Sequence, residues 1–274
     1  MDVDCLNYCL TKKEYLEFQQ KGILLIENVL SAKMIKDLTI VVDRLDSQFR
    51  ADKGMGPHDR LQQTDFVGKD EIFLNLIDWP KTFPKVWGIL GLNTQLYYSA
   101  MTVTPPVLPE GAKERKRLQW HQDSAELNKD LETNPRPRLS LKVAFFLTDT
   151  TELGRGNFYV IPKSHLQNEL KLSSDGISDP EEAMAIQAKA GSAVIFDRRL
   201  WHSASPNISN VTRKALFYGY SYRWIRPRDG MTVSHFMDRC DPVRQELLGA
   251  NPSWDANALR TWLKENGQEE KTMY

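Results

Sequence analysis

The sequence has few cysteines, no long apolar run and no excess of charge of either sign. Only three of its 274 residues are cysteine, and an odd, sparse set does not build a disulfide framework, which indicates a reducing compartment. No stretch approaches the roughly 18 apolar residues of a membrane span, and no apolar run follows a basic start as in a signal peptide. Lysine plus arginine and aspartate plus glutamate both total 36, so no overall basic field exists to hold nucleic acid or a membrane. These absences predict a soluble, cytoplasmic protein that binds neither nucleic acid nor a membrane.

Common catalytic motifs are missing as well. The chain has no glycine-rich phosphate loop, no His-Glu-x-x-His helix, no Cys-x-x-Cys pair and no nucleophile elbow, which removes several enzyme classes. Histidine is scarce, with five residues in all. We interpret His165 as a structural hydrogen-bonding residue at the end of a turn, and His58 and His235 as surface or loop residues. His121 and His202 remain as candidates for chemistry.

What is present suffices for a full core. With 41% apolar and 10% aromatic residues, the length suits one domain over 1–274 better than two small ones. Ser31 is a credible N-cap for a helix in which apolar residues recur every three or four positions. The elements expected before position 94 are a helix over 11–21 that stops at Gly22, a strand over 23–26, the helix after Ser31, a loop over 51–70 that borders the site, and a helix over 81–91.

Strands dominate the second half. Apolar or aromatic runs bounded by turn residues are expected strands, and they cover 94–103, 139–147, 157–161, 192–196 and 215–222. The charged run 110–117 is expected to be a solvated loop, and 235–268 a helical cover. Many strands with few central helices predict a mainly β protein with flanking helices, whose core is a double-sheet jelly roll, the cupin-like double-stranded β-helix.

The most informative feature is Trp120-His121-Gln122-Asp123, together with His202 far downstream. Residues two apart on an extended segment project to one face, so His121 and Asp123 can reach one ion while Gln122 points away. Two imidazoles and a carboxylate on one side of Fe(II) leave positions open for a co-substrate and O₂. Arg213 lies eleven positions after His202, and its planar fork suits the 5-carboxylate of 2-oxoglutarate.

A His-x-Asp pair alone is more often a hydrogen-bonded pair in a loop than a metal site, so its context decides. The surrounding motifs are Thr148-Asp149-Thr150-Thr151, Gly154-Arg155-Gly156-Asn157, Val160-Ile161-Pro162-Lys163-Ser164-His165, and 190–197 leading into Trp201-His202. In this order the chain resembles the phytanoyl-CoA dioxygenase family of Fe(II)/2-oxoglutarate oxygenases. The resemblance extends over most of the chain and starts with the helix over 11–21.

The resemblance implies the same double-stranded β-helix, iron held by His121, Asp123 and His202, and 2-oxoglutarate as co-substrate with O₂. It also implies that the strand before the metal motif touches the co-substrate. Tyr98 and Thr102 are its candidates, although ordinary strand packing explains both equally well. The list of co-substrate contacts is completed by Phe145, which stands where relatives carry a bulky residue.

The chain departs from the family pattern at three places. Gly154-Arg155-Gly156 replaces an Asn-Gly turn, Lys163 replaces the glycine of Pro-Gly-Ser-His, and Ser192 replaces an aspartate after Gly191. None is a predicted metal ligand, so the departures put only loop geometry in doubt. Halogenases that resemble the family have a small residue at the carboxylate position, so Asp123 favours hydroxylation over chlorination.

The resulting hypothesis is a non-haem Fe(II)- and 2-oxoglutarate-dependent dioxygenase that hydroxylates a small organic molecule and releases succinate and CO₂. Two alternatives stay open: a catalytically silent jelly-roll binding protein, and a family member that performs cyclisation, desaturation or epimerisation. Arg223, Arg226 and Arg228 suggest either an anion contact or an exposed basic turn, and we favour the turn. The segment 166–187 is equally well a lid or a surface insertion. The sequence does not determine the primary substrate or the oligomeric state.

Overall fold

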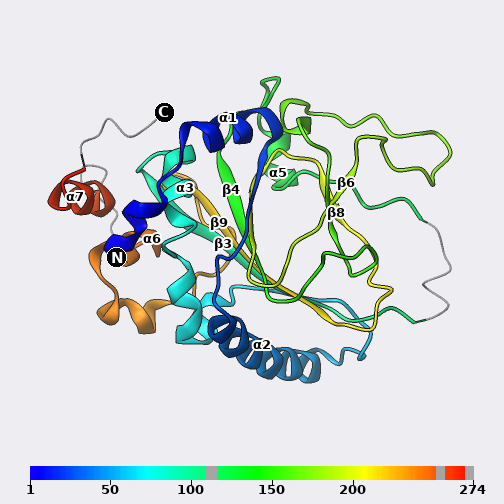
Figure 1. Cartoon of the computed structure of the whole chain (residues 1–274), viewed down its shortest axis with the longest axis horizontal. Helices are drawn as coiled ribbons and strands as arrows, with labels where there is room; N and C mark the ends of the chain where they lie inside the picture. Colours follow the sequence, from blue (N-terminus) through cyan, green and yellow to red (C-terminus); the bar gives the residue numbers. More distant parts are fainter. Residues whose placement is uncertain (109–115, 251–256, 269–274) are drawn as a thin grey trace.

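The computed structural model describes residues 1–108, 116–250 and 257–268 (Figure 1). Most of the charged run 110–117 therefore lies outside the described residues. The α-helices are α1 (Lys12–Lys21), α2 (Ala32–Lys53), α3 (Phe83–Leu90), α5 (Ala125–Lys129), α6 (Pro242–Leu247) and α7 (Ala258–Glu265). Short 3-10 helices are η1 (Val3–Tyr8), η2 (Val67–Lys69), η3 (Glu71–Leu76), η4 (Ser164–Leu166) and η5 (Ser234–Arg239).

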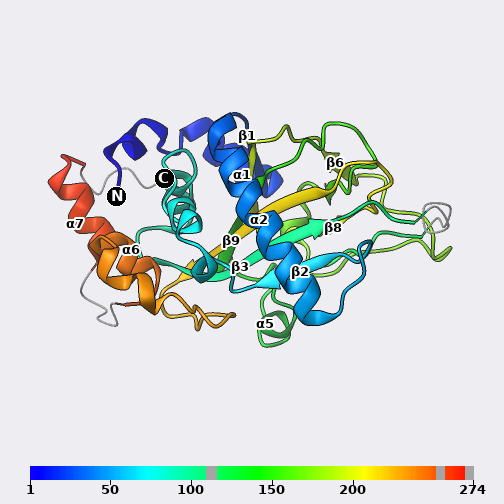
Figure 2. The same cartoon turned by 90° about the horizontal axis from the view of Figure 1, so that it is seen from below.

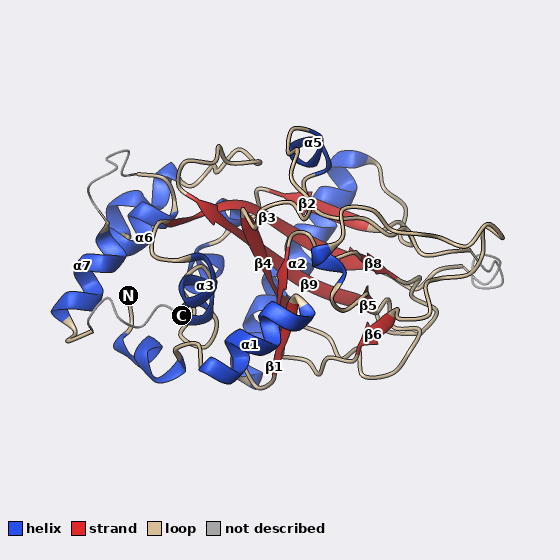
Figure 3. Ribbon diagram, turned by 90° about the horizontal axis from the view of Figure 1, so that it is seen from above, coloured by secondary structure: helices blue, strands red, loops and turns tan. Residues whose placement is uncertain are grey.

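Two antiparallel sheets form the jelly roll. The strands are β1 (Ile23–Ile26), β2 (Leu61–Thr64), β3 (Thr94–Thr104), β4 (Ser140–Phe146), β5 (Phe158–Val160), β6 (Met184–Ile186), β7 (Ala193–Asp197), β8 (His202–Ala204) and β9 (Arg213–Tyr222). The larger sheet has the order β1-β7-β4-β9-β3-β2, and the smaller has the order β6-β5-β8. In Figure 3 the strands of the larger sheet run through the middle of the molecule, beside β5, β6 and β8.

The helices cover the outer face of the larger sheet. Alternate residues of β4 (Leu141, Val143 and Phe145) belong to one buried cluster with residues of α2, α3, α6 and α7. Figure 2 shows α2 lying across this side of the sheet. Because side chains alternate along a strand, the intervening Ala144 and Phe146 face the smaller sheet, where they join Phe158 and Val160 of β5 in a second cluster.

The helix termini follow from local chemistry. Thr11 accepts a hydrogen bond from the Glu14 N–H, and the Glu14 side chain accepts one from the Thr11 N–H, which forms a capping box. Gly22 ends α1 at φ +77°, a conformation that glycine adopts without a steric penalty. Ser31 caps α2 as expected. Lys163, at the position where the family pattern has glycine, takes φ +71°, so the departure keeps the turn at some cost in backbone strain.

Most of the expected elements are confirmed, and three strands were missed. The prediction of a loop over 51–70 was wrong in part, because α2 continues to Lys53 and β2 pairs with β3 through Leu61↔Val103. The short strands β6 and β8 were also not expected. The described parts of 235–268 are helical, as predicted. No helix in the described ranges is long and apolar enough to cross a membrane.

Candidate metal centre

The three predicted ligands lie together at the start of β8. One potential ligand atom from each of His121, Asp123 and His202 lies within 4.8 Å of the others. The main chain fixes this spacing, because the N–H of His121 donates to the His202 carbonyl and the N–H of His202 donates to the His121 carbonyl, both at 3.0 Å. The Asp123 N–H donates to the carbonyl of Arg198 at 2.9 Å. The ligands are therefore placed by backbone pairing as well as by side-chain packing.

Both imidazoles are oriented through one ring nitrogen. Nδ1 of His121 lies 3.0 Å from the Gln119 carbonyl, and Nδ1 of His202 lies 2.8 Å from the Leu200 carbonyl. A carbonyl only accepts, so each Nδ1 carries a proton, and Nε2 is the nitrogen that the neutral ring would offer to a metal. Burial lowers the pKa of His202 to about 4 although the charge of Asp123 opposes the shift, so the ring is neutral near pH 7. Neutral, oriented imidazoles are what a metal requires.

Asp123 offers one free oxygen. Oδ1 accepts a hydrogen bond from Nζ of Lys142 at 2.5 Å, whereas the buried Oδ2 has no hydrogen-bond partner among the described residues. Burial acts to raise the pKa of Asp123, but the charges of Lys142 and His202 lower it to about 2. An ionised carboxylate with an unsatisfied buried oxygen is costly unless a cation completes it. The donor set therefore fits a divalent metal held through Oδ2 and two imidazole nitrogens.

Gln122 points away from the ligands, as expected. Its side-chain amide donates to the carbonyls of Gln167 and Arg199, the latter at 2.5 Å. These bonds join the ligand segment to the residue that follows η4 and to the turn that precedes β8. Gln122 therefore supports the backbone of its two neighbours.

Replacement of Lys142 by methionine is expected to destabilise the metal-free protein by about 3 kcal/mol, because removal of one partner leaves a buried charge uncompensated. Added Co(II) should recover most of this loss, since the metal then supplies the missing positive charge. Chemical unfolding with and without Co(II) measures both effects. Lys129→Met is the control, because Lys129 pairs with Glu126 on the surface. If metal-free Lys142→Met has the same free energy of unfolding as the wild type, the ion pair between Lys142 and Asp123 does not contribute to stability.

A cavity of about 720 Å³ extends from the ligands between the two sheets. Tyr98 and Thr102 of β3 line it, as their shared face predicts. Phe145 does not, and this expectation was wrong. Strand alternation turns Phe145 to the helical side, where its ring packs against Tyr218 at 5.6 Å between centroids. The aromatic residue of β4 that faces inward is the next one, Phe146.

Arg213 lines the same cavity and begins β9. It is 2% exposed, its Nε and Nη2 have no hydrogen-bond partners among the described residues, and its guanidinium lies 5.4 Å from the centroid of the Phe146 ring. Burial and the charge of Arg60 lower the pKa of Arg213 to about 10, so it stays charged near pH 7. A buried guanidinium with free donors is prepared for an anion.

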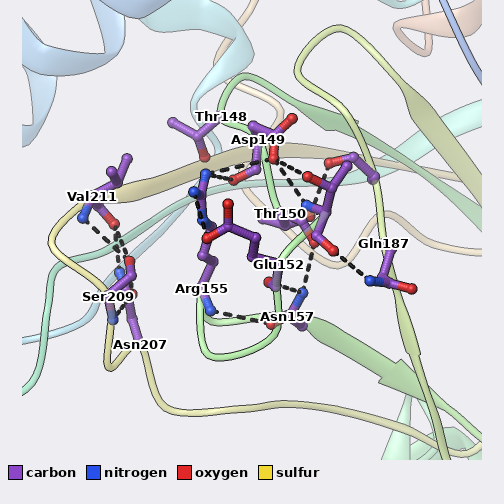
Figure 4. A network of polar contacts seen from close by, with 12 residues as sticks. Thr148, Asp149, Thr150, Glu152, Arg155, Asn157, Gln187, Asn207, Ser209 and Val211 are labelled. Carbon is purple, nitrogen blue, oxygen red and sulfur yellow. Dashed lines mark hydrogen bonds and ion pairs between the residues drawn. The ribbon is translucent and has the colours of Figure 1, made fainter.

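Polar contacts hold the loops that contain Asn157 and Asn207 (Figure 4). The Asn157 side chain donates to the Thr150 carbonyl at 2.7 Å, and the Asn207 side chain donates to the Val211 carbonyl at 2.8 Å. Gly156, at φ +65°, lies against this arginine, and an added Cβ would stand 3.3 Å from Arg213 Cδ. The Gly-Arg-Gly departure from the family turn thus keeps the chain in close contact with Arg213.

The segment 166–187 is fastened to the chain just before the metal motif. Asp179 accepts hydrogen bonds from the Leu118 N–H at 2.9 Å and from Nε1 of Trp120 at 2.8 Å. Arg117 donates to the carbonyls of Ser173 and Ser178. The segment is therefore in direct contact with the residues that precede His121.

Three cavity residues were missed or undervalued in the sequence. Lys142 is the only charge within an apolar strand, a signal that a polar interior lies on its face of β4. Arg60 lies in the stretch expected to be a loop, although that stretch does border the cavity as predicted. Arg228 lies in an exposed turn, as interpreted, but it also lines the cavity.

The other histidines lie apart from the ligand cluster. His165 is buried and its Nε2 lies 3.1 Å from the Gln19 carbonyl, in agreement with a structural role. His235 is exposed on η5. His58 is also exposed, at the rim of the cavity, with Nδ1 2.9 Å from the Pro106 carbonyl.

Solved structures share this fold. The carbocyclase SnoK from nogalamycin biosynthesis, a non-heme α-ketoglutarate-dependent enzyme, is 20% identical with a TM-score of 0.58, over 85% of this chain and 92% of its own. HygX from Streptomyces hygroscopicus, solved with nickel and 2-oxoglutarate, is 14% identical with a TM-score of 0.62, over 80% and 90%. The epimerase SnoN from nogalamycin biosynthesis, also non-heme and α-ketoglutarate-dependent, is 16% identical with a TM-score of 0.56, over 77% and 80%.

The sequence itself gives the family. A profile of the phytanoyl-CoA dioxygenase family matches residues 18–215, a span that runs from α1 to β9 and contains the ligand cluster and Arg213. With the double-sheet core, the convergent His-Asp-His cluster and the buried arginine in one cavity, the chain belongs to the phytanoyl-CoA dioxygenase family.

Proposed function

We propose that this protein is a non-haem Fe(II)- and 2-oxoglutarate-dependent dioxygenase that hydroxylates a small organic molecule and releases succinate and CO₂. The observation that carries the proposal is one cavity with two unsatisfied charged groups: the free Oδ2 of Asp123 and the free donors of Arg213. The first calls for a cation and the second for an anion. Family membership and the nickel and 2-oxoglutarate in HygX support the choice of ligands.

The residues divide the work in a defined way. His121, Asp123 and His202 would hold iron on one side, and iron would supply the activation of O₂. Lys142 keeps Oδ1 of Asp123 occupied at 2.5 Å, which leaves Oδ2 to coordinate. Arg213 would bind the far carboxylate of 2-oxoglutarate bidentately, while the rings of Phe158, Phe196 and Phe217 give the cavity an apolar wall. The protein's contribution is positioning and exclusion of water.

The test of the proposal is succinate release from 2-oxoglutarate by the iron-loaded protein, screened against a metabolite collection for compounds that stimulate it. His121→Ala should abolish release, and the exposed His235→Ala should not. Stimulated release that persists in His121→Ala would contradict the assignment. If no preparation consumes 2-oxoglutarate with any compound, the result would favour a catalytically silent binding protein.

Hydroxylation is the outcome expected from the intact carboxylate at Asp123. With its stimulating compound, ¹⁸O₂ and excess chloride, the wild-type protein should give a product that carries ¹⁸O and no chlorine, because the carboxylate occupies the position that chloride would need. Mass spectrometry of the product gives the answer. A chlorinated main product would mean that the role of Asp123 is misassigned.

Ring closure and epimerisation are the second candidate outcome, because a carbocyclase and an epimerase share the fold. The same product analysis separates them from hydroxylation. Cyclisation or desaturation removes two hydrogens without adding oxygen, and epimerisation leaves the mass unchanged. Both the loss of two hydrogens and an unchanged mass differ from the gain of one oxygen that hydroxylation gives.

A further inference from the structure

The charge of the cavity wall is strongly one-sided, although the whole chain has no net charge. Among the described residues that line it, Asp123 is the one carboxylate, whereas the cations are Arg60, Lys116, Arg117, Lys142, Arg213 and Arg228. Lys142 pairs with Asp123, and Arg117 pairs with Asp175. A cleft lined by one sign of charge concentrates ligands of the opposite sign. Arg213 and iron would account for 2-oxoglutarate, which leaves the role of Arg228 to be explained.

Arg228 is a cavity cation whose backbone and side chain are both positioned by contacts with other elements. Its backbone N–H donates to the Tyr97 carbonyl at 2.7 Å, and the next residue, Asp229, accepts from the N–H of Ser99 at 2.6 Å. Both contacts fasten the turn to β3. The guanidinium lies 5.1 Å from the centroid of the Tyr98 ring and donates to Oγ of Ser124 at 3.2 Å. No carboxylate partner of Arg228 occurs within the described ranges.

Arg228 and Arg213 serve different levels of the cavity. In the register of the larger sheet, Arg213 pairs with Thr104, whereas Tyr98 and Lys142 both pair with Gly219. Thr104 and Tyr98 are six positions apart on β3, which corresponds to about 20 Å of strand. The carbon chain of 2-oxoglutarate is much shorter than this. The far carboxylate at Arg213 is therefore held well away from Arg228, although the metal-binding end of the co-substrate reaches the level of Lys142, because Lys142 contacts the ligand Asp123.

We infer that the primary substrate is a small anion whose carboxylate, phosphate or sulfate group is held by Arg228, with Ser124 and the Tyr98 ring beside it. The inference rests on the proposed function, because the level of Arg213 is assigned to 2-oxoglutarate. Ser124 directly follows the ligand Asp123, so an acid group at Arg228 would bring the rest of the molecule to the metal. Arg228 is a specificity-determining residue in this arrangement.

The experiment uses the full chain loaded with Ni(II) and 2-oxoglutarate, which fills the metal site and Arg213 without turnover. Small carboxylates, phosphate monoesters and sulfate esters, each paired with its neutral amide or alcohol, are screened by ligand-observed NMR, and inorganic sulfate is titrated as a competitor. The anionic member of a pair should bind and the neutral member should not. Arg228→Gln should weaken binding about tenfold or more, and Arg228→Lys should weaken it less.

Arg226→Gln is the matched control, because Arg226 is exposed in the same turn as the likewise exposed Arg228 but does not line the cavity. It should bind the anions as the wild type does. The inference is overturned if neutral members bind as well as the anions, if Arg228→Gln keeps the wild-type affinity, or if no anion binds to the loaded complex. If the protein does not bind 2-oxoglutarate together with Ni(II), the loaded complex does not form. That result counts against the proposed function.

Discussion

His202→Ala is expected to lose stoichiometric iron. The wild-type protein should bind one Fe(II) per chain, and a site of three protein ligands that loses one should weaken by about a hundredfold or more, since loss of even an outer-shell contact costs 10–100-fold. His202 is buried, its ring is oriented by the Leu200 carbonyl, and the other imidazole of the cluster, His121, is itself a predicted ligand. Metal analysis after dialysis and a Co(II) titration followed by absorption measure the loss.

The same loss is expected for His121→Ala and Asp123→Ala. His235→Ala should keep its iron, because His235 is exposed and lies outside the cluster. Circular dichroism of each variant would show whether the fold is retained. If His202→Ala still binds one iron per chain, the assignment of His121, Asp123 and His202 as the metal ligands is wrong.

Arg213→Ala is expected to weaken 2-oxoglutarate binding about a hundredfold, which corresponds to roughly 3 kcal/mol for a carboxylate that loses a charge-assisted bidentate partner. Arg213→Lys should lie between alanine and wild type, because an ammonium keeps the charge but lacks the planar fork. Titration of 2-oxoglutarate into the anaerobic Fe(II) protein, followed through the metal-to-ligand absorption band, gives the dissociation constants.

Lys214→Ala is the matched control for Arg213, since it is the next residue of β9 and its side chain pairs with Asp43 at 2.6 Å. It should keep the wild-type affinity for 2-oxoglutarate. Without ligand, Arg213→Ala should be as stable as the wild type or more stable, because a buried guanidinium with free donors is unfavourable. An unchanged dissociation constant would mean that another residue holds the co-substrate.

The elements with strong local signals were predictable. The capping residues Thr11 and Ser31, the stop at Gly22 and the run that becomes β3 all depend on interactions within a few residues. The strand β2 was not predictable, because its pairing with β3 outweighs the charges and turn residues around it. The three-residue strands β6 and β8 are too short to show a period.

The site residues that belong to sequence motifs were predictable. The residues that only the folded chain brings to the cavity were not. The His-x-Asp spacing and the family pattern pointed to a cluster that the fold does bring together. The error at Phe145 was one of strand parity, and Lys142 in the same strand was the signal that could have corrected it. Arg228 does lie in an exposed turn, as expected, but nothing local shows that this turn binds back to β3 and brings Arg228 to the cavity.

The reciprocal hydrogen bonds between the backbones of His121 and His202 have a consequence for how such proteins can diversify. Because the main chain sets the ligand spacing, the chain between them can change in length without disturbing the metal, as the extended excursion over 166–187 illustrates. Surface insertions are in general well tolerated. Selection can therefore rebuild the cavity mouth, and with it the range of accepted molecules, while the reactive centre is inherited intact.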